Sequence, residues 1–223
     1  MRFSSKLLKK CEELCRADQP ITSLAEPPGL GKDGGRSRMN MKILDLTEQN
    51  LGKAPEWEAY PFSCKYCLYW EYPELSFDPA AGVSEGEFSK KLAWLRRVRK
   101  EWGSCGKLLF VGNETVGYAQ YAPAQFLPGA REYPAWPVSE DAVLLACLFI
   151  PKPKFLGKGL GGLLAEAILE ELSARGIQGV ETFARRGSAE NPSGPVEFYL
   201  RHGFSALRDD PEFPLLRRDL IPH

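Results

Sequence analysis

The sequence predicts an α/β fold in which helices flank a mixed β-sheet and a flexible leader precedes the domain. Strand-like and helix-like hydrophobic patterns alternate from residue 41 onward. An unbroken apolar run at residues 142–150 is typical of a strand that is covered on both faces. Residues 1–40, in contrast, are rich in proline and glycine over their second half and have the composition of a disordered leader.

Composition excludes several classes of function. The 223 residues allow one domain with additional segments, or two small domains. Basic and acidic side chains number 29 each, which argues against nucleic acid as a partner. No stretch approaches the roughly 20 apolar residues of a membrane-spanning helix, so we expect no membrane partner. Six cysteines without a secretory signal indicate a reducing compartment, and we expect a cytoplasmic protein.

The domain is expected to begin at Met41. The leader ahead of it cannot bury enough apolar surface to offset the entropy of ordering it. A strand at residues 41–46 and a helix opening at 47–51, with Thr47 as its N-cap, follow at once. We therefore assign residues 41–223 to the domain and hypothesise that translation begins at its first methionine.

A helix and a hairpin are expected next. Ser84 and Glu87 have the spacing of a capping box, and apolar residues at helical spacing follow them. Residues 107–111 and 115–122 are strand-like and are separated by Gly-Asn-Glu, which predicts a hairpin. A long loop rich in proline and aromatic residues spans 123–139.

The second half of the chain alternates strands and helices. A helix over residues 160–172 follows the apolar run and is stopped by Gly176. The remaining expected elements are a strand at 177–184, a short helix at 195–202, and strands at 204–208 and 215–220. This order implies a mixed sheet with helices on its faces.

The strongest chemical signal lies where the apolar strand meets the long helix. Gly157, Gly159, Gly161 and Gly162 let the backbone turn tightly and bring several N–H groups together at the helix N-terminus. With the charge of Lys158 beside them, they predict a pyrophosphate site. Two alternatives stay open. One is a glycine turn that only lets the helix pack on the sheet, and the other is a dinucleotide loop, which lacks its usual downstream acidic residue.

Two motifs resemble those of the GNAT superfamily of acetyl-CoA-dependent N-acetyltransferases. Residues 157–161, Gly-Lys-Gly-Leu-Gly after an apolar strand, are similar to its acetyl-CoA loop. Residues 196–204, Val-Glu-Phe-Tyr-Leu-Arg-His-Gly-Phe, are similar to its tyrosine signature. The resemblance covers about residues 41–220. It implies a GNAT-like mixed, mainly antiparallel sheet flanked by helices, with acetyl-CoA as cosubstrate.

The resemblance also implies which residues contact acetyl-CoA. They lie at the end of the apolar strand, in the glycine loop and before the second helix: Leu148, Ile150, Lys154, Leu156, Gly157, Lys158, Gly159, Leu160, Gly161, Gly162 and Asn191. This chain departs from the family at one position. Leu156 stands where Arg or Gln is usual, unless Lys154 is taken as the basic residue.

The catalytic groups implied by the resemblance are an acid and a base. Tyr199 is the implied general acid, since a phenol with an ordinary pKa of about 10 keeps its proton at neutral pH and can give it to a leaving thiolate. The alternative is a tyrosine that only fills the core. Glu181 and Glu140 are candidates for the base, and the alternative for each is a solvated surface charge.

An insert at residues 52–82 is rich in cysteine and aromatic residues. Cys64 and Cys67 form a CxxC pair, but no second pair follows to complete four zinc ligands, so no metal is expected. The strand–helix setting of a redox CxxC is also missing.

The aromatic residues of the insert have two interpretations. They fill the core, or they line an acceptor groove in which we expect Trp70, Tyr133 and Trp136. In a groove, the acidic residues nearby would suit a cationic amine; the candidates are Glu58, Glu71 and Glu74.

The expected function is transfer of an acetyl group from acetyl-CoA to a primary amine of a small molecule or peptide, by direct attack. The alternatives are a non-catalytic acyl-CoA-binding sensor or interaction module of the same fold, and a zinc-stabilised interaction module. The sequence does not identify the acceptor, and it leaves a homodimer open as the oligomeric state.

Overall fold

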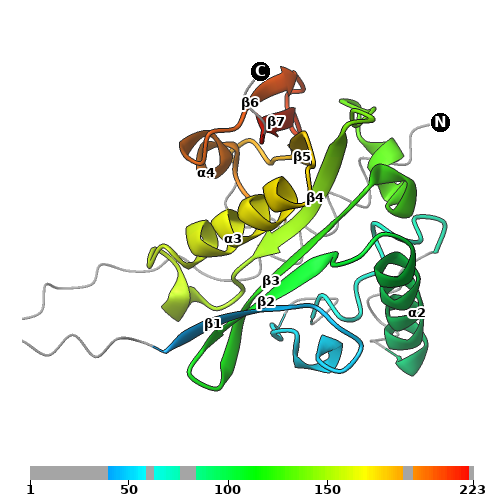
Figure 1. The fold of residues 1–223 in the computed structure, drawn as a ribbon, viewed down its shortest axis with the longest axis vertical. Coiled ribbons are helices and arrows are strands. Elements are labelled where there is room, and N and C mark those ends of the chain that lie inside the picture. The colour runs from blue at the N-terminus through cyan, green and yellow to red at the C-terminus, as the bar shows by residue number, and fades with distance from the viewer. Residues whose placement is uncertain (1–39, 59–62, 76–83, 188–192, 221–223) are drawn as a thin grey trace, which may run out of the picture.

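The structure, a computed structural model, describes residues 40–58, 63–75, 84–187 and 193–220. These residues form a seven-stranded sheet in the order β1-β2-β3-β4-β5-β7-β6 (Figure 1). The strands are β1 (Met41–Asp45), β2 (Gly106–Val111), β3 (Glu114–Ala122), β4 (Ala142–Phe149), β5 (Gly179–Phe183), β6 (Ser205–Arg208) and β7 (Leu215–Asp219). The helices are α2 (Glu85–Glu101), α3 (Leu160–Ala174) and α4 (Val196–Arg201).

Short 3₁₀ helices complete the described elements. They are η1 (Leu51–Lys53), η3 (Ala124–Phe126), η4 (Pro128–Glu132) and η5 (Pro153–Phe155). Two of them, η3 and η4, lie in the stretch for which the sequence predicts only a loop. The predicted leader, up to residue 39, lies outside the described residues.

The sheet is mixed and mainly antiparallel, as the sequence predicts. β4 and β5 are parallel, and all the other neighbouring strands pair antiparallel. β3 and β4 each carry an irregularity in register, opposite Leu109/Phe110 and Gln120/Tyr121 respectively. Each irregularity inserts an extra residue, which bends the strand and changes the face to which the next side chains point.

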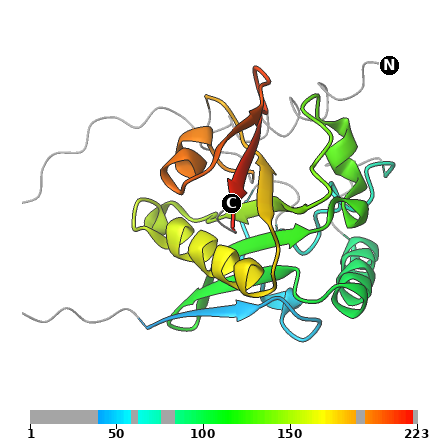
Figure 2. The same ribbon diagram turned by 45° about the horizontal axis from the view of Figure 1, so that its top comes forward.

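Helices cover both faces of the sheet (Figure 2), and each face has its own apolar core. On one face, α2 packs through Trp94, Leu95 and Val98. On the other face lie α3 and α4, which contribute Leu164, Ile168 and Tyr199 among others. β4 serves both cores, which explains why its sequence is apolar without interruption.

The predicted boundaries agree with the structure to within two residues for most elements. The capping box of α2 is confirmed, because the Ser84 side chain accepts a hydrogen bond from the Gly86 N–H and the Ser84 N–H donates to Glu87. That hydrogen-bonded arrangement also lowers the pKa of Glu87. The hairpin between β2 and β3 is likewise confirmed.

The helix predicted at residues 47–51 is wrong. The chain makes a turn there and then only the short η1. The Asn50 side chain accepts a hydrogen bond from the Thr47 N–H at 2.7 Å, so the expected N-cap is itself held by a side chain from the turn. Pro55 follows shortly after and disfavours helical backbone at Ala54, so no longer helix can form.

Candidate functional site

A fork between two parallel strands is the centre of the candidate site. β4 and β5 pair only at Ala142–Gly179, Val143–Val180 and Leu144–Glu181. β4 then continues to Phe149 alongside β3, while β5 ends at Phe183 alongside β7. Beyond Leu144, the edge of β4 that faces β5 has no strand partner among the described residues. β5 therefore does not use the backbone N–H and C=O groups of that edge.

The glycine loop lies at the end of β4 and opens α3. Gly157 and Gly159 have positive φ values of 69° and 76°, which favour glycine. Gly159 is the N-cap of α3, and its carbonyl accepts a hydrogen bond from the Leu163 N–H at 3.1 Å. The N–H groups of the first turn of a helix have no acceptor within the helix and carry its positive partial charge. This loop therefore presents a set of donors to an anion.

The other two glycines allow α3 and α4 to approach closely. A Cβ added at Gly161 would lie 3.3 Å from the Phe198 ring, and one added at Gly162 would lie 2.8 Å from the His202 ring. Nothing lies within 4 Å of a Cβ added at Gly157 or Gly159. Packing thus accounts for the second pair of glycines, and the left-handed backbone of the loop accounts for the first pair.

The lysines near the loop differ in their partners. Lys152 and Lys154 both pair with Glu114, at 2.6 and 2.9 Å, and these contacts lower the pKa of that carboxyl group. Lys158 lies over the Phe155 ring at 5.8 Å and has no carboxylate partner among the described residues. Among these three lysines, Lys158 has the charge that is most available to an anion.

The apolar residues expected to contact acetyl-CoA differ in exposure. Leu148 and Ile150 are buried in the core beneath α3, together with Leu160. Leu156 is 56% exposed beside the glycine loop. Asn191 lies outside the described residues.

Tyr199 is fully buried beneath the fork. Its ring packs against Phe198 and Phe204 of the core shared by α3 and α4. Gly194 passes so close that a Cβ there would lie 3.3 Å from the Tyr199 hydroxyl. The hydroxyls of Tyr199 and of Thr182 on β5 interact, although neither reaches a well-formed hydrogen bond with any described group. Burial raises the pKa of Tyr199 above its ordinary value, so the phenol keeps its proton.

The two candidate bases lie in different surroundings. Glu181 is buried at the last β4–β5 pair, where it accepts hydrogen bonds from the Ser139 N–H and from Arg217, both at 3.0 Å. Arg217 also pairs with Asp141 at 2.8 Å, and this contact raises the pKa of its guanidinium. Glu140 is exposed at the start of β4. The contacts of Glu181 therefore tie the parallel strands together and leave its carboxylate occupied.

The aromatic residues expected at an acceptor groove form a stack in the core. Trp70 and Tyr133 are each 4% exposed, and their rings are parallel at 5.3 Å. Tyr133 stacks in turn on Phe183 at 4.4 Å. Trp136 is only partly buried against the same core. Of the two interpretations left by the sequence, the structure supports core packing for Trp70 and Tyr133.

The CxxC pair lies in a turn against the α2 face of the sheet. The Cys67 N–H donates to the Cys64 carbonyl at 3.3 Å, and the Cys64 side chain is buried. Burial raises the pKa of both thiols, and it raises that of Cys147 on β4 to about 12. Within the described residues, no group of three or more His, Cys, Asp or Glu side chains could hold a metal ion.

A buried polar network on this face escaped the sequence analysis. Lys91 of α2 forms an ion pair with Glu71 and donates to Gln120 of β3 at 2.7 Å. The Gln120 amide donates to the same Glu71 oxygen at 2.6 Å, and Tyr118 donates to Gln120 at 2.7 Å. One signal was present in the sequence. Lys91 precedes the apolar residue Leu95 by four positions and Val98 by seven, which places all three on one side of the helix.

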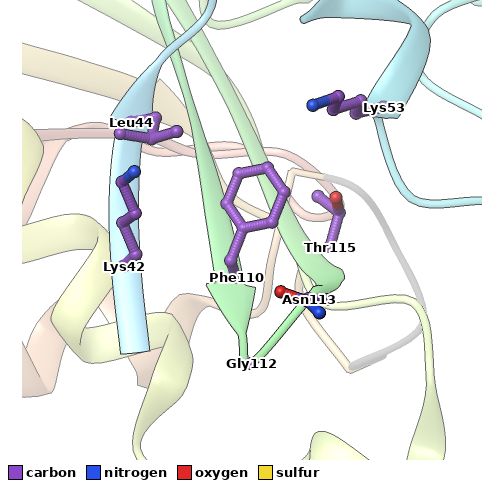
Figure 3. Close-up of a pocket in the computed structure, with 7 residues that line it drawn as sticks. All are labelled: Lys42, Leu44, Lys53, Phe110, Gly112, Asn113 and Thr115. Atoms are coloured by element: carbon purple, nitrogen blue, oxygen red, sulfur yellow. The ribbon is translucent and has the colours of Figure 1, made fainter. Parts of the chain in front are cut away.

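An open pocket of about 590 Å³ lies elsewhere, over the outer strands (Figure 3). It is lined by Lys42, Leu44, Lys53, Phe110, Gly112, Asn113 and Thr115. None of the residues that the sequence assigns to acetyl-CoA or to catalysis lines it. In the part of the chain that the structure describes, no helix is long and apolar enough to cross a membrane.

Comparisons with known proteins bear on the fold. No protein-family model and no curated protein matches the chain. Among solved structures, it is similar to the PaiA N-acetyltransferase of Thermoplasma acidophilum in complex with coenzyme A, with 14% identity and a TM-score of 0.52 over 81% of this chain and 99% of that one. It is also similar to an N-acetyltransferase of Staphylococcus aureus Mu50, with 12% identity and a TM-score of 0.51 over 82% and 99% of the two chains. The chain therefore has the GNAT fold.

Proposed function

We propose that this GNAT-fold chain is an N-acetyltransferase that moves an acetyl group from acetyl-CoA to the primary amine of a small molecule or peptide. The observation that carries the proposal is the convergence of three features at one place. The β4–β5 fork, the glycine loop at the end of β4, and Tyr199 beneath the fork all meet there. The structural relative from Thermoplasma acidophilum, which has the same fold, was crystallised with coenzyme A.

Acetyl-CoA would be held mainly by backbone groups. The free N–H groups of Leu160, Gly161 and Gly162 suit a pyrophosphate, and Lys158 adds a charge that no described carboxylate neutralises. The unpaired edge of β4 beyond Leu144 offers alternating donors and acceptors to the amide groups of the pantetheine arm. Asn191 remains a proposed cofactor contact.

The reaction needs three things from the protein. A neutral amine attacks the thioester carbonyl, a backbone N–H near the end of β4 stabilises the resulting oxyanion, and an acid protonates the leaving thiolate. Tyr199 supplies that acid. Burial raises its pKa, so the phenol stays protonated at neutral pH until the leaving thiolate takes the proton.

The base is the least defined group. Glu181 is held by Arg217 and by the Ser139 N–H, and Glu140 lies exposed at the opposite end of β4 from the glycine loop. Neither arrangement favours the removal of a proton from an amine at the fork. A third carboxylate, Glu71, is considered below.

The proposal is tested by incubating the purified chain with acetyl-CoA and a panel of primary amines, with the products read by mass spectrometry. An amine whose mass increases by one acetyl group supports the proposal. The alternative of a non-catalytic acyl-CoA-binding module predicts saturable binding of acetyl-CoA, measured by calorimetry, with no acetylated product for any amine.

A further inference from the structure

We propose that Glu71 receives the acceptor as a neutral primary amine, by accepting a hydrogen bond from it and taking its proton as the amine attacks. This inference rests on the proposed function, because it places the acceptor at the β4–β5 fork. It also gives a role to the Cys-Lys-Tyr-Cys-Leu-Tyr-Trp-Glu segment, residues 64–71, which the acetyl-CoA site does not explain.

The position of Glu71 supports this role. Gln120, which donates to Glu71 at 2.6 Å, lies directly opposite Cys147 in the β3–β4 ladder. Cys147 follows the register irregularity of β4, just beyond the point where β5 leaves. The Gln120 side chain therefore connects Glu71 to the part of β4 on which the thioester would rest. Glu71 lies on the α2 face of the sheet, opposite the face that α3 covers.

One oxygen of Glu71 is left unsatisfied. Oε1 accepts from both Lys91 and Gln120, but Oε2 is buried and has no hydrogen-bond partner among the described residues. A buried carboxylate oxygen without a donor is unfavourable, so it is expected to be filled in some state of the protein. A neutral primary amine has N–H donors for that oxygen, and a carboxylate can accept the proton that the amine loses on acylation.

The groups that face Glu71 leave it as the proton acceptor. Lys91 from α2 stays charged: burial lowers its pKa, but the Glu71 carboxylate raises it further, and the net shift is upward. Burial raises the pKa of Tyr118 from β3 and of the nearby thiols Cys64, Cys67 and Cys147. Among these described groups, Glu71 is the one carboxylate, a group that serves as a general base.

The surroundings also restrict the class of acceptor. Lys91 already balances the charge of Glu71, and it lies over the Trp94 ring at 5.4 Å. Any cation on the acceptor would therefore be buried without a partner, which is costly. The Trp70 side chain, which lies close enough to the Cys147 thiol to affect its pKa, adds an uncharged aromatic neighbour. The favoured acceptor is therefore a primary monoamine on a slender, uncharged arm, rather than a polyamine.

The chemical step is balanced by these groups. The lone pair of the neutral amine forms the N–C bond to the thioester carbonyl, and the C–S bond breaks. One N–H proton passes to Glu71 Oε2, and the thiolate takes the Tyr199 proton. The products are the acetamide and coenzyme A, and solvent returns Glu71 and Tyr199 to their starting states.

The test must separate this role from a purely structural one. Glu71→Gln alone would leave the buried Lys91 charge unpaired and could prevent folding. The variant to use is Glu71→Gln/Lys91→Met, because replacing a whole buried pair by neutral groups of similar volume usually preserves stability. The matched control is Glu171→Gln/Lys107→Met, which removes a partly buried ion pair of 2.5 Å that joins β2 to α3.

Each protein is assayed for melting temperature, for acetyl-CoA affinity by calorimetry, and for acetylation of 2-phenylethylamine, n-pentylamine and spermidine by mass spectrometry. We expect the Glu71→Gln/Lys91→Met protein to fold, to bind acetyl-CoA as the wild type does, and to lose at least about 100-fold in kcat/KM for the monoamines. The control should keep its turnover.

The outcomes distinguish the two proposals. Turnover by the Glu71→Gln/Lys91→Met variant within a few-fold of the wild type would overturn the role of Glu71 and leave the acetyltransferase proposal intact. A preference of the wild type for spermidine over both monoamines would overturn the assigned acceptor class. A wild type that acetylates no amine would overturn both proposals.

Discussion

Leu144 of β4 and Glu181 of β5 are the last residues to pair across the parallel strands. Glu181 is held there by Arg217 at 3.0 Å and by the Ser139 N–H at 3.0 Å, so this end of the fork is fixed. From that point β4 follows β3 and β5 follows β7. The two strands therefore separate because each continues along an antiparallel neighbour on its other side. Among the residues that the structure describes, this separation leaves one edge of β4 unpaired where the proposed reaction takes place.

The charge of Lys158 should matter more to acetyl-CoA than that of Lys154. Lys154 pairs with Glu114 at 2.9 Å, whereas Lys158 has no carboxylate partner among the described residues. We expect Lys158→Ala to weaken acetyl-CoA binding by about 3- to 10-fold at low salt, and Lys154→Ala by about 2-fold or less. Calorimetric titration measures both. Equal losses for the two variants would contradict this assignment.

Gly129 should be essential for docking the long loop on the insert. Its N–H donates to the Trp70 carbonyl at 2.9 Å, and an added Cβ would lie 2.4 Å from the Tyr69 carbonyl oxygen. Since both groups are backbone, Gly129→Ala should lower the free energy of unfolding by about 2–4 kcal/mol. Gly52→Ala, where nothing lies within 4 Å, is the control and should change it by about 0.5 kcal/mol or less. Urea unfolding compares the two, and similar midpoints would refute the close approach.

The buried thiols should be slow to alkylate in the native protein. Burial raises the pKa of Cys64 and Cys67, and it raises that of Cys105 and Cys147 to about 12. Few thiolates are then present near neutral pH, and the thiolate is the reactive form. Iodoacetamide labelling near pH 8, followed by peptide mass spectrometry, should modify these residues at least about 10-fold faster in urea than in the native state. Rapid native labelling of Cys64 or Cys147 would show that the α2 face is open.

Removal of the first 39 residues should leave the domain intact. The sheet begins with Asn40, whose carbonyl accepts from the Gly112 N–H at 2.8 Å, and with β1. Among the described residues, both apolar cores are built from β1 onward. We expect the truncated chain to keep its melting temperature within about 2 °C and its turnover unchanged, because it loses none of these contacts. Differential scanning calorimetry on both chains checks this, and a markedly lower transition would assign the leader to the fold.

The order of strands and helices was predictable because each element carries its own hydrophobic period. The capping box of α2 and the glycine stop of α3 are local signals of the same kind. The predicted helix at residues 47–51 failed because a side-chain contact, from Asn50 to the Thr47 N–H, competes with helical backbone bonding. Local sequence signals therefore predict the longer helices and strands well, but they predict short segments near turns poorly.

The candidate site could be predicted from the sequence only where one continuous segment of the chain forms it. The glycine loop and Tyr199 each belong to a continuous motif. The ion pair between Glu71 and Lys91 joins positions 20 residues apart, and its contact to Gln120 spans 49 residues from Glu71. No local pattern encodes such contacts. The same holds for the stack of Trp70 on Tyr133, which depends on how the long loop packs against the insert.

The central claim, that Tyr199 donates the proton to the leaving thiolate, is tested most directly by Tyr199→Phe. Its buried hydroxyl makes no well-formed hydrogen bond with a described group, so its removal should not destabilise the fold. Because burial raises the pKa of Tyr199, the wild-type rate should not fall through loss of this proton up to about pH 10.

The decisive measurement compares acetyl-CoA affinity and kcat in wild type and Tyr199→Phe. We predict an affinity within about 3-fold of the wild type and a kcat that is lower by about 100-fold or more. A variant that binds acetyl-CoA and turns over at the wild-type rate would contradict the account.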